Sequence, residues 1–183
     1  MMRALVLALA ACAAPAWQLP QGWRGETFAF PIDFAPALPH RGFEVLRFAP
    51  GFLELGKPGH WSYAFAWRLD DPAALDAPAL AGELTAYFRG VIAAVDDKHR
   101  IADVDRARIA IAATPDRGGF ALHGLVFDAF GDGGPLELSG TAERRACGGG
   151  ALWLVTFTPA ANPTYRAQLA AVVRDATCQN VRR

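Results

Sequence analysis

The chain has 183 residues, 52% of them hydrophobic, and its 18 basic side chains are balanced by 18 acidic ones. This composition is typical of a globular protein with one sizeable core, and it excludes a disordered chain, a coiled coil and a collagen-like repeat. The zero net charge also argues against a nucleic-acid partner, because binding to phosphates requires a surplus of basic side chains.

The first sixteen residues have the features of a secretory signal peptide. Arg3 supplies a short positive region, residues 4–11 are apolar, and residues 14–16 (Ala-Pro-Ala) have the small side chains that signal peptidase accepts. The apolar run is shorter than the roughly 20 residues that span a bilayer, so no transmembrane segment is expected. We therefore predict a signal peptide over 1–16 and an exported mature chain, periplasmic or secreted, that begins at Trp17.

A second interpretation concerns the processing site. The stretch Leu9-Ala10-Ala11-Cys12 resembles the lipobox of bacterial lipoproteins, in which the cysteine is lipidated and becomes the first mature residue. The alternative to a free exported protein is therefore a lipoprotein anchored through Cys12.

Two cysteines, Cys147 and Cys178, follow the signal segment. An even number suits an oxidising compartment. A strand over 151–157 and a helix over 163–177 would both cover roughly 23 Å, at about 3.3 Å and 1.5 Å per residue. If the helix runs back along the strand, the two cysteines finish at the same end, which favours a disulfide over two buried free thiols.

The first half of the mature chain predicts three strands and a helix. Strands are expected over 26–34, 43–48 and 61–69, although Pro31 weakens the second half of the first one. Asp76 is a suitable N-cap for the helix that follows, because Pro78 lies in its first turn and apolar residues then recur at helical spacing up to Val95.

The second half predicts four strands and a final helix. The strands are expected over 107–112, 120–127, 136–143 and 151–157, separated by Gly-rich turns. The stretch Asn162-Pro163 is expected to cap the last helix.

This element order predicts an α+β fold in one domain over 17–183. Strands joined by short turns form antiparallel hairpins, so we expect a single antiparallel sheet of about six to seven strands covered by two main helices, as in an α/β/α sandwich. Between 61 and 67 the large aromatic residues share one strand face and small residues share the other, which indicates a central strand with both faces covered. Most of this aromatic row is expected in the core, with Trp61 at its end remaining accessible beside a ligand groove.

Two resemblances accompany this pattern. The element order resembles Mog1/PsbP-like domains, which are secreted or binding α/β/α sandwiches. The stretches 30–36 (Phe-Pro-Ile-Asp-Phe-Ala-Pro), 46–51 (Leu-Arg-Phe-Ala-Pro-Gly) and 61–65 (Trp-Ser-Tyr-Ala-Phe) resemble an uncharacterised group of exported bacterial proteins. That second resemblance implies export and no particular activity.

The sequence contains no recognisable catalytic, metal-binding or cofactor-binding motif. The four histidines are scattered, and Gly-x-Ser-x-Gly, Walker and Gly-x-Gly-x-x-Gly patterns are missing. Asp128, Asp132 and Glu137 lack the spacing of a calcium loop, and a tight hairpin turn explains them better. The residues that we select as ligand-binding candidates are Glu44, Arg47, Trp61 and Arg68.

We therefore expect a monomeric, non-catalytic exported domain, without cofactor, that binds a small molecule or an envelope protein. One alternative is a small hydrolase whose carboxylate or histidine site is assembled from distant loops. Another is an inhibitor or assembly factor that acts through an edge strand over 26–32. A concave pocket with converging titratable groups would favour the enzyme, and an apolar or Arg-lined groove would favour the binding protein.

Overall fold

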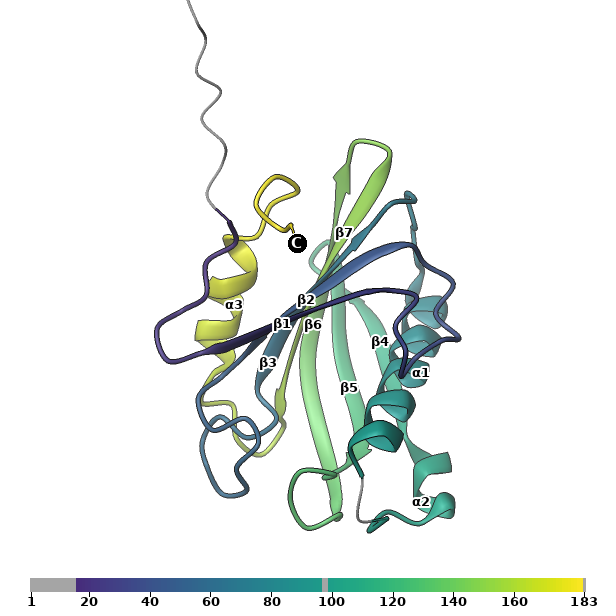
Figure 1. The fold of residues 1–183 in the computed structure, drawn as a ribbon, viewed down its shortest axis with the longest axis vertical. Helices are drawn as coiled ribbons and strands as arrows, with labels where there is room; N and C mark the ends of the chain where they lie inside the picture. The colour runs from purple at the N-terminus through teal and green to yellow at the C-terminus, as the bar shows by residue number, and fades with distance from the viewer. Residues whose placement is uncertain (1–15, 97–98, 183) are drawn as a thin grey trace, which may run out of the picture.

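The computed structural model describes residues 16–96 and 99–182 (Figure 1). The signal segment that the sequence predicts lies outside these ranges except for Ala16, and so does Cys12. One antiparallel sheet of seven strands, in the order β1-β2-β3-β7-β6-β5-β4, forms the middle of the molecule. Its strands are β1 (Arg24–Phe30), β2 (Gly42–Phe48), β3 (Tyr63–Leu69), β4 (Ala110–Asp116), β5 (Gly119–Phe127), β6 (Pro135–Cys147) and β7 (Gly150–Pro159).

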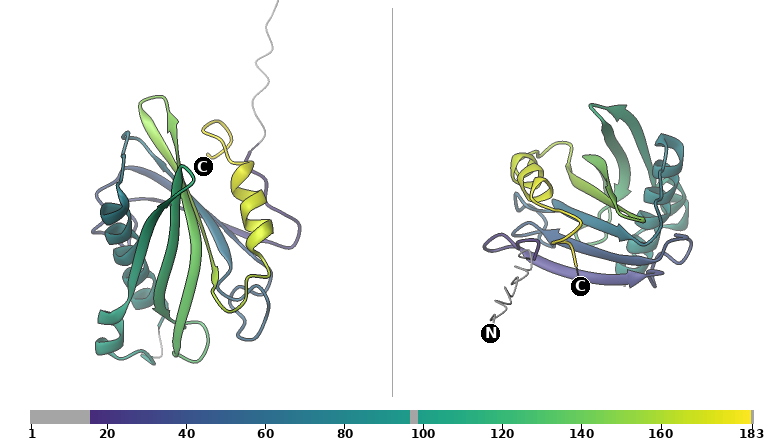
Figure 2. Two further views of the ribbon diagram at one scale, coloured as in Figure 1. Left: turned by 180° about the vertical axis from the view of Figure 1, so that it is seen from behind. Right: turned by 90° about the horizontal axis from the view of Figure 1, so that it is seen from above.

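The two longer helices cover opposite faces of this sheet (Figure 2). Helix α1 (Ala77–Val95) packs in one hydrophobic cluster with the large side chains of β3, β5 and β7, whereas α3 (Arg166–Arg174) packs in a second cluster with the opposite side of β3 and β7. The predicted α+β fold with a single antiparallel sheet is therefore confirmed.

Strand β3 shows how the sequence builds the two faces. Because successive side chains of a strand point to opposite sides, Tyr63, Phe65 and Trp67 face α1 while Ala64 and Ala66 face α3. All five are buried, with exposed fractions of 3% or less. The large rings fill the space beneath α1, and the small alanines allow α3 to approach the sheet closely.

Helix α1 begins as predicted. The Asp76 carboxylate accepts a hydrogen bond from the Ala79 amide at 2.9 Å, and Pro78 occupies the first turn, where it has no hydrogen bond to lose. Its buried face consists of Leu80, Leu84, Tyr87, Phe88 and Ile92.

Several predicted boundaries are wrong. Helix α2 (Asp103–Arg108) lies where only a loop and the start of a strand were expected, with two aspartates in its first turn and two arginines in its last turn, as the helix dipole favours. Helix α3 begins at Arg166 and not at Pro163, because the Asn162 side chain accepts hydrogen bonds from Thr164 and forms a turn there. Strand β1 ends at Phe30, since Pro31 has no amide to donate.

Cys147, at the end of β6, and Cys178, after α3, lie within disulfide-bonding distance, with Cα atoms 5.6 Å apart. The expected pairing of these two residues is therefore supported by their position. None of the helices within the described residues is long and apolar enough to cross a bilayer.

Trp17 fixes the start of the described chain to the α3 face. Its indole Nε1 donates a hydrogen bond to the Val172 carbonyl at 2.9 Å, and its amide donates to the Asn180 carbonyl at 2.8 Å. The guanidinium of Arg47 lies 4.5 Å from the centre of the same indole ring. The residue predicted to begin the mature chain is thus part of the folded core.

Candidate functional site

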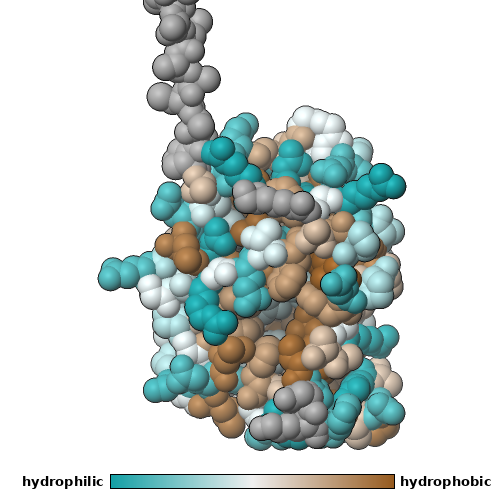
Figure 3. All heavy atoms as spheres, in the orientation of Figure 1, coloured by the Kyte–Doolittle hydropathy of each residue, from teal (hydrophilic) through white to brown (hydrophobic). Residues whose placement is uncertain are grey.

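A cavity of about 300 Å³ lies between the first three strands and the C-terminal half of α1. In Figure 3, hydrophobic side chains surround a hollow in the lower half of the face that Figure 1 shows. Eight of the fifteen lining residues are aromatic, and they are Phe28, Phe34, Phe48, Phe52, Trp61, Tyr63, Tyr87 and Phe130. This size and lining are typical of sites for small organic molecules.

The strand register explains why these residues meet. Arg24, Phe48 and Tyr63 are aligned across β1, β2 and β3, and Glu26 and Leu46 are aligned in the next row. Side chains two residues apart on one strand share a face, so both rows point toward α1. There the helix contributes the smaller residues Val91, Ala94 and Val95, which leaves room between helix and sheet.

Charged groups of the cavity lie at its solvent-exposed rim. Arg24 Nη2 and Glu26 Oε1 are 3.6 Å apart, and both side chains are substantially exposed. Leu53 is 42% exposed and also lines the cavity, from the loop that follows β2. The opening is therefore flanked by one exposed ion pair and one exposed aliphatic side chain.

Trp61 lines the cavity, but the prediction that it remains accessible is wrong. It is 1% exposed, because the rings of Phe52 and Phe130 cover it at centroid distances of 6.0 and 4.9 Å. Trp61 precedes β3 and has a φ of 53°, a left-handed conformation that is unusual for a bulky side chain. Its indole Nε1 donates a hydrogen bond to Asp128 Oδ1 at 2.8 Å, which helps to hold this conformation.

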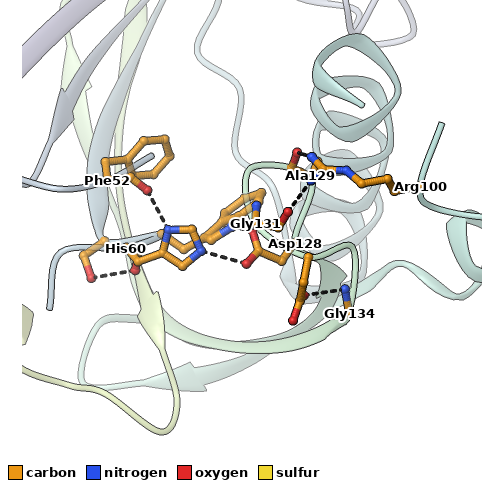
Figure 4. Close-up of polar contacts among 10 residues, drawn as sticks. Phe52, His60, Arg100, Asp128, Ala129, Gly131 and Gly134 are labelled. Atoms are coloured by element: carbon orange, nitrogen blue, oxygen red, sulfur yellow. Dashed lines mark hydrogen bonds and ion pairs between the residues drawn. The ribbon is translucent and has the colours of Figure 1, made fainter. Parts of the chain in front are cut away.

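Asp128 also binds His60, and together they form a clasp between the loop before β3 and the turn after β5 (Figure 4). His60 Nε2 lies 2.8 Å from Asp128 Oδ2, and His60 Nδ1 lies 3.0 Å from the Phe52 carbonyl. The Gly131 amide donates to Asp128 Oδ1 at 2.8 Å. We call this arrangement the His60–Asp128 clasp; it fixes the cavity wall that carries Phe52 and Trp61.

The pKa of Asp128 follows from these contacts. Burial by itself raises the pKa of the carboxyl group, but hydrogen bonds from His60, Trp61 and Gly131 outweigh that effect and hold the pKa below its usual value. Arg100 extends the arrangement, because its guanidinium donates to the carbonyls of Ala129 and Gly131 in the same turn (Figure 4).

The clasp holds the structure together and offers no catalytic base. Both ring nitrogens of His60 face acceptors, and His60 and Asp128 are only 7% and 5% exposed. The nearby Ser62 hydroxyl is 3.0 Å from Thr158 Oγ1 and is fully buried. Among the described residues, no group of three or more His, Cys, Asp or Glu side chains is arranged to hold a metal ion.

Glu44 lies on β2 beside this cavity and is completely buried. Its Oε1 accepts a hydrogen bond from the Trp67 indole at 3.0 Å, whereas its Oε2 has no hydrogen-bond partner. Burial raises the pKa of Glu44 to about 8, even though contacts with Trp67 and Tyr87 act in the opposite direction. The group is therefore mostly protonated at neutral pH.

The four predicted candidates are divided between the two faces of the sheet. Trp61 and Glu44 lie on the α1 side, where Trp61 lines the cavity and Glu44 bonds to Trp67 next to it. Arg47 points to the α3 side, where it stacks on Trp17 and donates to the Trp17 carbonyl at 2.8 Å. Arg68 follows Trp67 on β3, so its side chain also points to the α3 side, and its guanidinium donates to the Leu69 carbonyl at 3.0 Å.

Sequence reasoning missed the helical side of the cavity and the His60–Asp128 clasp. The helix periodicity does identify Tyr87 and Val91 as facing the sheet, but it does not show that a cavity remains beneath them. His60 and Asp128 are 68 residues apart in the chain, and no local motif relates them. The turn interpretation of Asp128 and Asp132 agrees with the structure, since each accepts a backbone hydrogen bond within the turn.

Comparison with known proteins adds no family assignment. No protein-family model matches the chain, and no curated protein or solved structure does either.

Proposed function

We propose that this protein binds a small, largely apolar organic molecule in the aromatic cavity beneath α1, without catalysing its conversion. The observation that carries the proposal is the cavity itself, about 300 Å³ in volume and lined by eight aromatic side chains. What distinguishes this cavity from the other hollows of the described residues is its aromatic lining and not its volume, and such a lining is typical of sites for small organic molecules.

The geometry of the opening supports binding over catalysis. The titratable side chains that line the cavity are the exposed pair Arg24 and Glu26 at its rim and the buried tyrosines Tyr63 and Tyr87. Burial raises the pKa of both tyrosines well above the usual value, so they are neutral at physiological pH. A general acid and base pair needs two groups poised near the working pH, and these residues do not supply one.

We also propose that the protein acts in an oxidising compartment outside the cytoplasm, in the periplasm or secreted. The signal-like segment and the position of Cys147 beside Cys178 support this location. Release by signal peptidase and anchoring through Cys12 are the two routes to it.

The cavity can be tested with N-phenyl-1-naphthylamine, an uncharged aromatic probe whose emission rises in apolar surroundings. Ala94 and Ala93 are adjacent, exposed residues on α1, but only Ala94 is among the lining residues. We expect Ala94→Trp to fill the cavity and weaken probe binding by about tenfold or more, and Ala93→Trp to leave it within about twofold. Equal binding by both variants, or no saturable binding by the wild-type protein, would contradict the proposed function.

A further inference from the structure

Glu44 lies beside the cavity, one row deeper in the sheet than the lining residues Glu26 and Leu46. Across the first three strands, Glu26 and Leu46 occupy a row that lines the cavity, and Phe28, Glu44 and Trp67 occupy the next one. The Glu44 side chain points to the α1 side, since it accepts a hydrogen bond from Trp67. Phe28, which is paired with Glu44, and Tyr87, which acts on its pKa, both line the cavity, so the carboxyl group lies directly behind this part of the wall.

The carboxyl group has hydrogen-bonding capacity that the protein does not use. Glu44 Oε2 is buried and has no hydrogen-bond partner. The Tyr87 hydroxyl lies near the group and affects its pKa, but it completes no hydrogen bond with this oxygen. A buried polar atom without a partner is destabilising, so its retention points to a partner that is supplied from outside the chain.

The aromatic lining favours the same kind of partner. The faces of Trp and Tyr rings attract organic cations, and cages of aromatic side chains are the usual binding sites for ammonium groups. The rim adds no net charge to this environment, because Arg24 is paired with Glu26. An aromatic cavity thus lies next to one carboxyl group that lacks a cationic partner.

We propose that the ligand is a small organic amine, whose apolar body fills the aromatic cavity and whose ammonium group donates a hydrogen bond to Glu44 Oε2. This inference rests on the proposed function, since it names the chemical class of the molecule that the cavity binds. Glu44 is then the residue that determines specificity, and Tyr87 positions the ammonium group beside it.

This mode of binding predicts a distinctive dependence on pH. The groups that face Glu44 are Glu26 from β1, Trp67 and Tyr63 from β3, and Tyr87 from α1. His40, bonded to Glu83, also lies near, with its ring centre 6.3 Å from that of Trp67. Because the pKa of Glu44 is about 8, an ammonium ligand must displace its proton below that pH. Affinity should rise by about tenfold per pH unit from pH 6 toward pH 8.

The test compares 2-phenylethylamine with 2-phenylethanol, which has a similar shape and no charge, by calorimetry at pH 6, 7 and 8. We expect the amine to bind the wild-type protein more tightly as the pH rises and the alcohol to show no such trend. Glu44→Gln should weaken amine binding at pH 8 by about tenfold and abolish the trend. Glu54→Gln, which removes an exposed carboxylate from the loop after β2, should leave both properties unchanged.

The outcomes separate this inference from the proposed function. N-phenyl-1-naphthylamine reports whether each variant still has an intact cavity. If that probe binds Glu44→Gln normally and the amine loses affinity, the inference holds. If the amine binds the wild-type protein no better than the alcohol at pH 8, or if Glu44→Gln leaves its affinity unchanged, the inference is wrong while the cavity proposal stands. If neither the probe nor the amine binds the wild-type protein, both are wrong.

Discussion

The two faces of the sheet differ in how their side chains fill space. On the α1 side, β3 presents Tyr63, Phe65 and Trp67, and the planar rings of this face leave a cavity under the end of the helix. On the α3 side, the same strand presents Ala64 and Ala66, and α3 lies against them with Cys178 anchored beside Cys147. Alternation along a single strand therefore gives one closely packed face and another that leaves a cavity beneath a helix.

The largest expected effect on stability comes from the aromatic face. Phe65 is fully buried and lies beneath Tyr87, with ring centroids 5.3 Å apart. Phe65→Ala should lower the free energy of unfolding by roughly 3–5 kcal/mol, measured by urea denaturation. Phe28 lines the cavity and is only partly buried, so Phe28→Ala should lower the free energy of unfolding by less than Phe65→Ala does. Equal costs at the two positions would show that the cavity-lining side of this face is packed as tightly as its centre.

On the opposite face, the corresponding test is removal of the cysteine pair. Cys147 and Cys178 are separated by 31 residues in the sequence, and a cross-link over this distance stabilises the native state by roughly 3–4 kcal/mol on the chain-entropy model. The double Cys→Ser variant should lose about that amount under non-reducing conditions and still bind N-phenyl-1-naphthylamine, because the cavity lies on the other face. Peptide mapping that finds both thiols free in protein purified without reductant would contradict the prediction.

A smaller effect is expected from the His60–Asp128 clasp, which stabilises the cavity wall. Asp128→Asn removes the charge that His60 and Trp61 bind, so the free energy of unfolding should fall by about 2–3 kcal/mol. Asp132 lies in the same turn, is exposed in its contact with the Gly134 amide, and provides the matched control. Asp132→Asn should cost less than about 1 kcal/mol, and a similar cost for the two variants would argue against the clasp.

The smallest expected change, counted per pH unit, is in the pH dependence of stability. Glu44 has a usual pKa of 4.5 and a folded-state pKa of about 8, so between these values the native protein binds one more proton than the unfolded chain. Its contribution to stability is therefore complete below about pH 4.5 and is lost as the pH rises toward 8, by roughly 1 kcal/mol per pH unit. Glu44→Gln should flatten this part of the profile, as chemical denaturation at pH 5 to 8 would show. An unchanged slope would place the titrating group elsewhere.

Much of the fold could be predicted from local patterns. The alternation in β3, the N-cap Asp76 and the spacing of apolar residues in α1 are consequences of short-range geometry, and each was correctly placed. Boundaries were less accurate wherever a side chain competed with the backbone for hydrogen bonds, as Asn162 does before α3.

The site could be predicted only in part, because it depends on how distant segments pack. Of the four candidate residues, Trp61 lines the cavity and Glu44 lies beside it, but Arg47 and Arg68 lie on the other side of the sheet. Strand alternation already separates Trp67 from Arg68, so that division was available from the sequence. The burial of Trp61 could not be predicted from the sequence, because it depends on Phe130, which is 69 positions further along the chain.

The position of Trp61 has a practical consequence for spectroscopy. The chain contains five tryptophans, and Trp61 alone among them lines the cavity beneath α1. Trp17 and Trp23 belong to the cluster on the other face of the sheet. The difference in intrinsic emission between the wild-type protein and Trp61→Phe therefore isolates the signal of the one indole that lines this cavity. The protein thus carries its own optical reporter for screening unlabelled compounds.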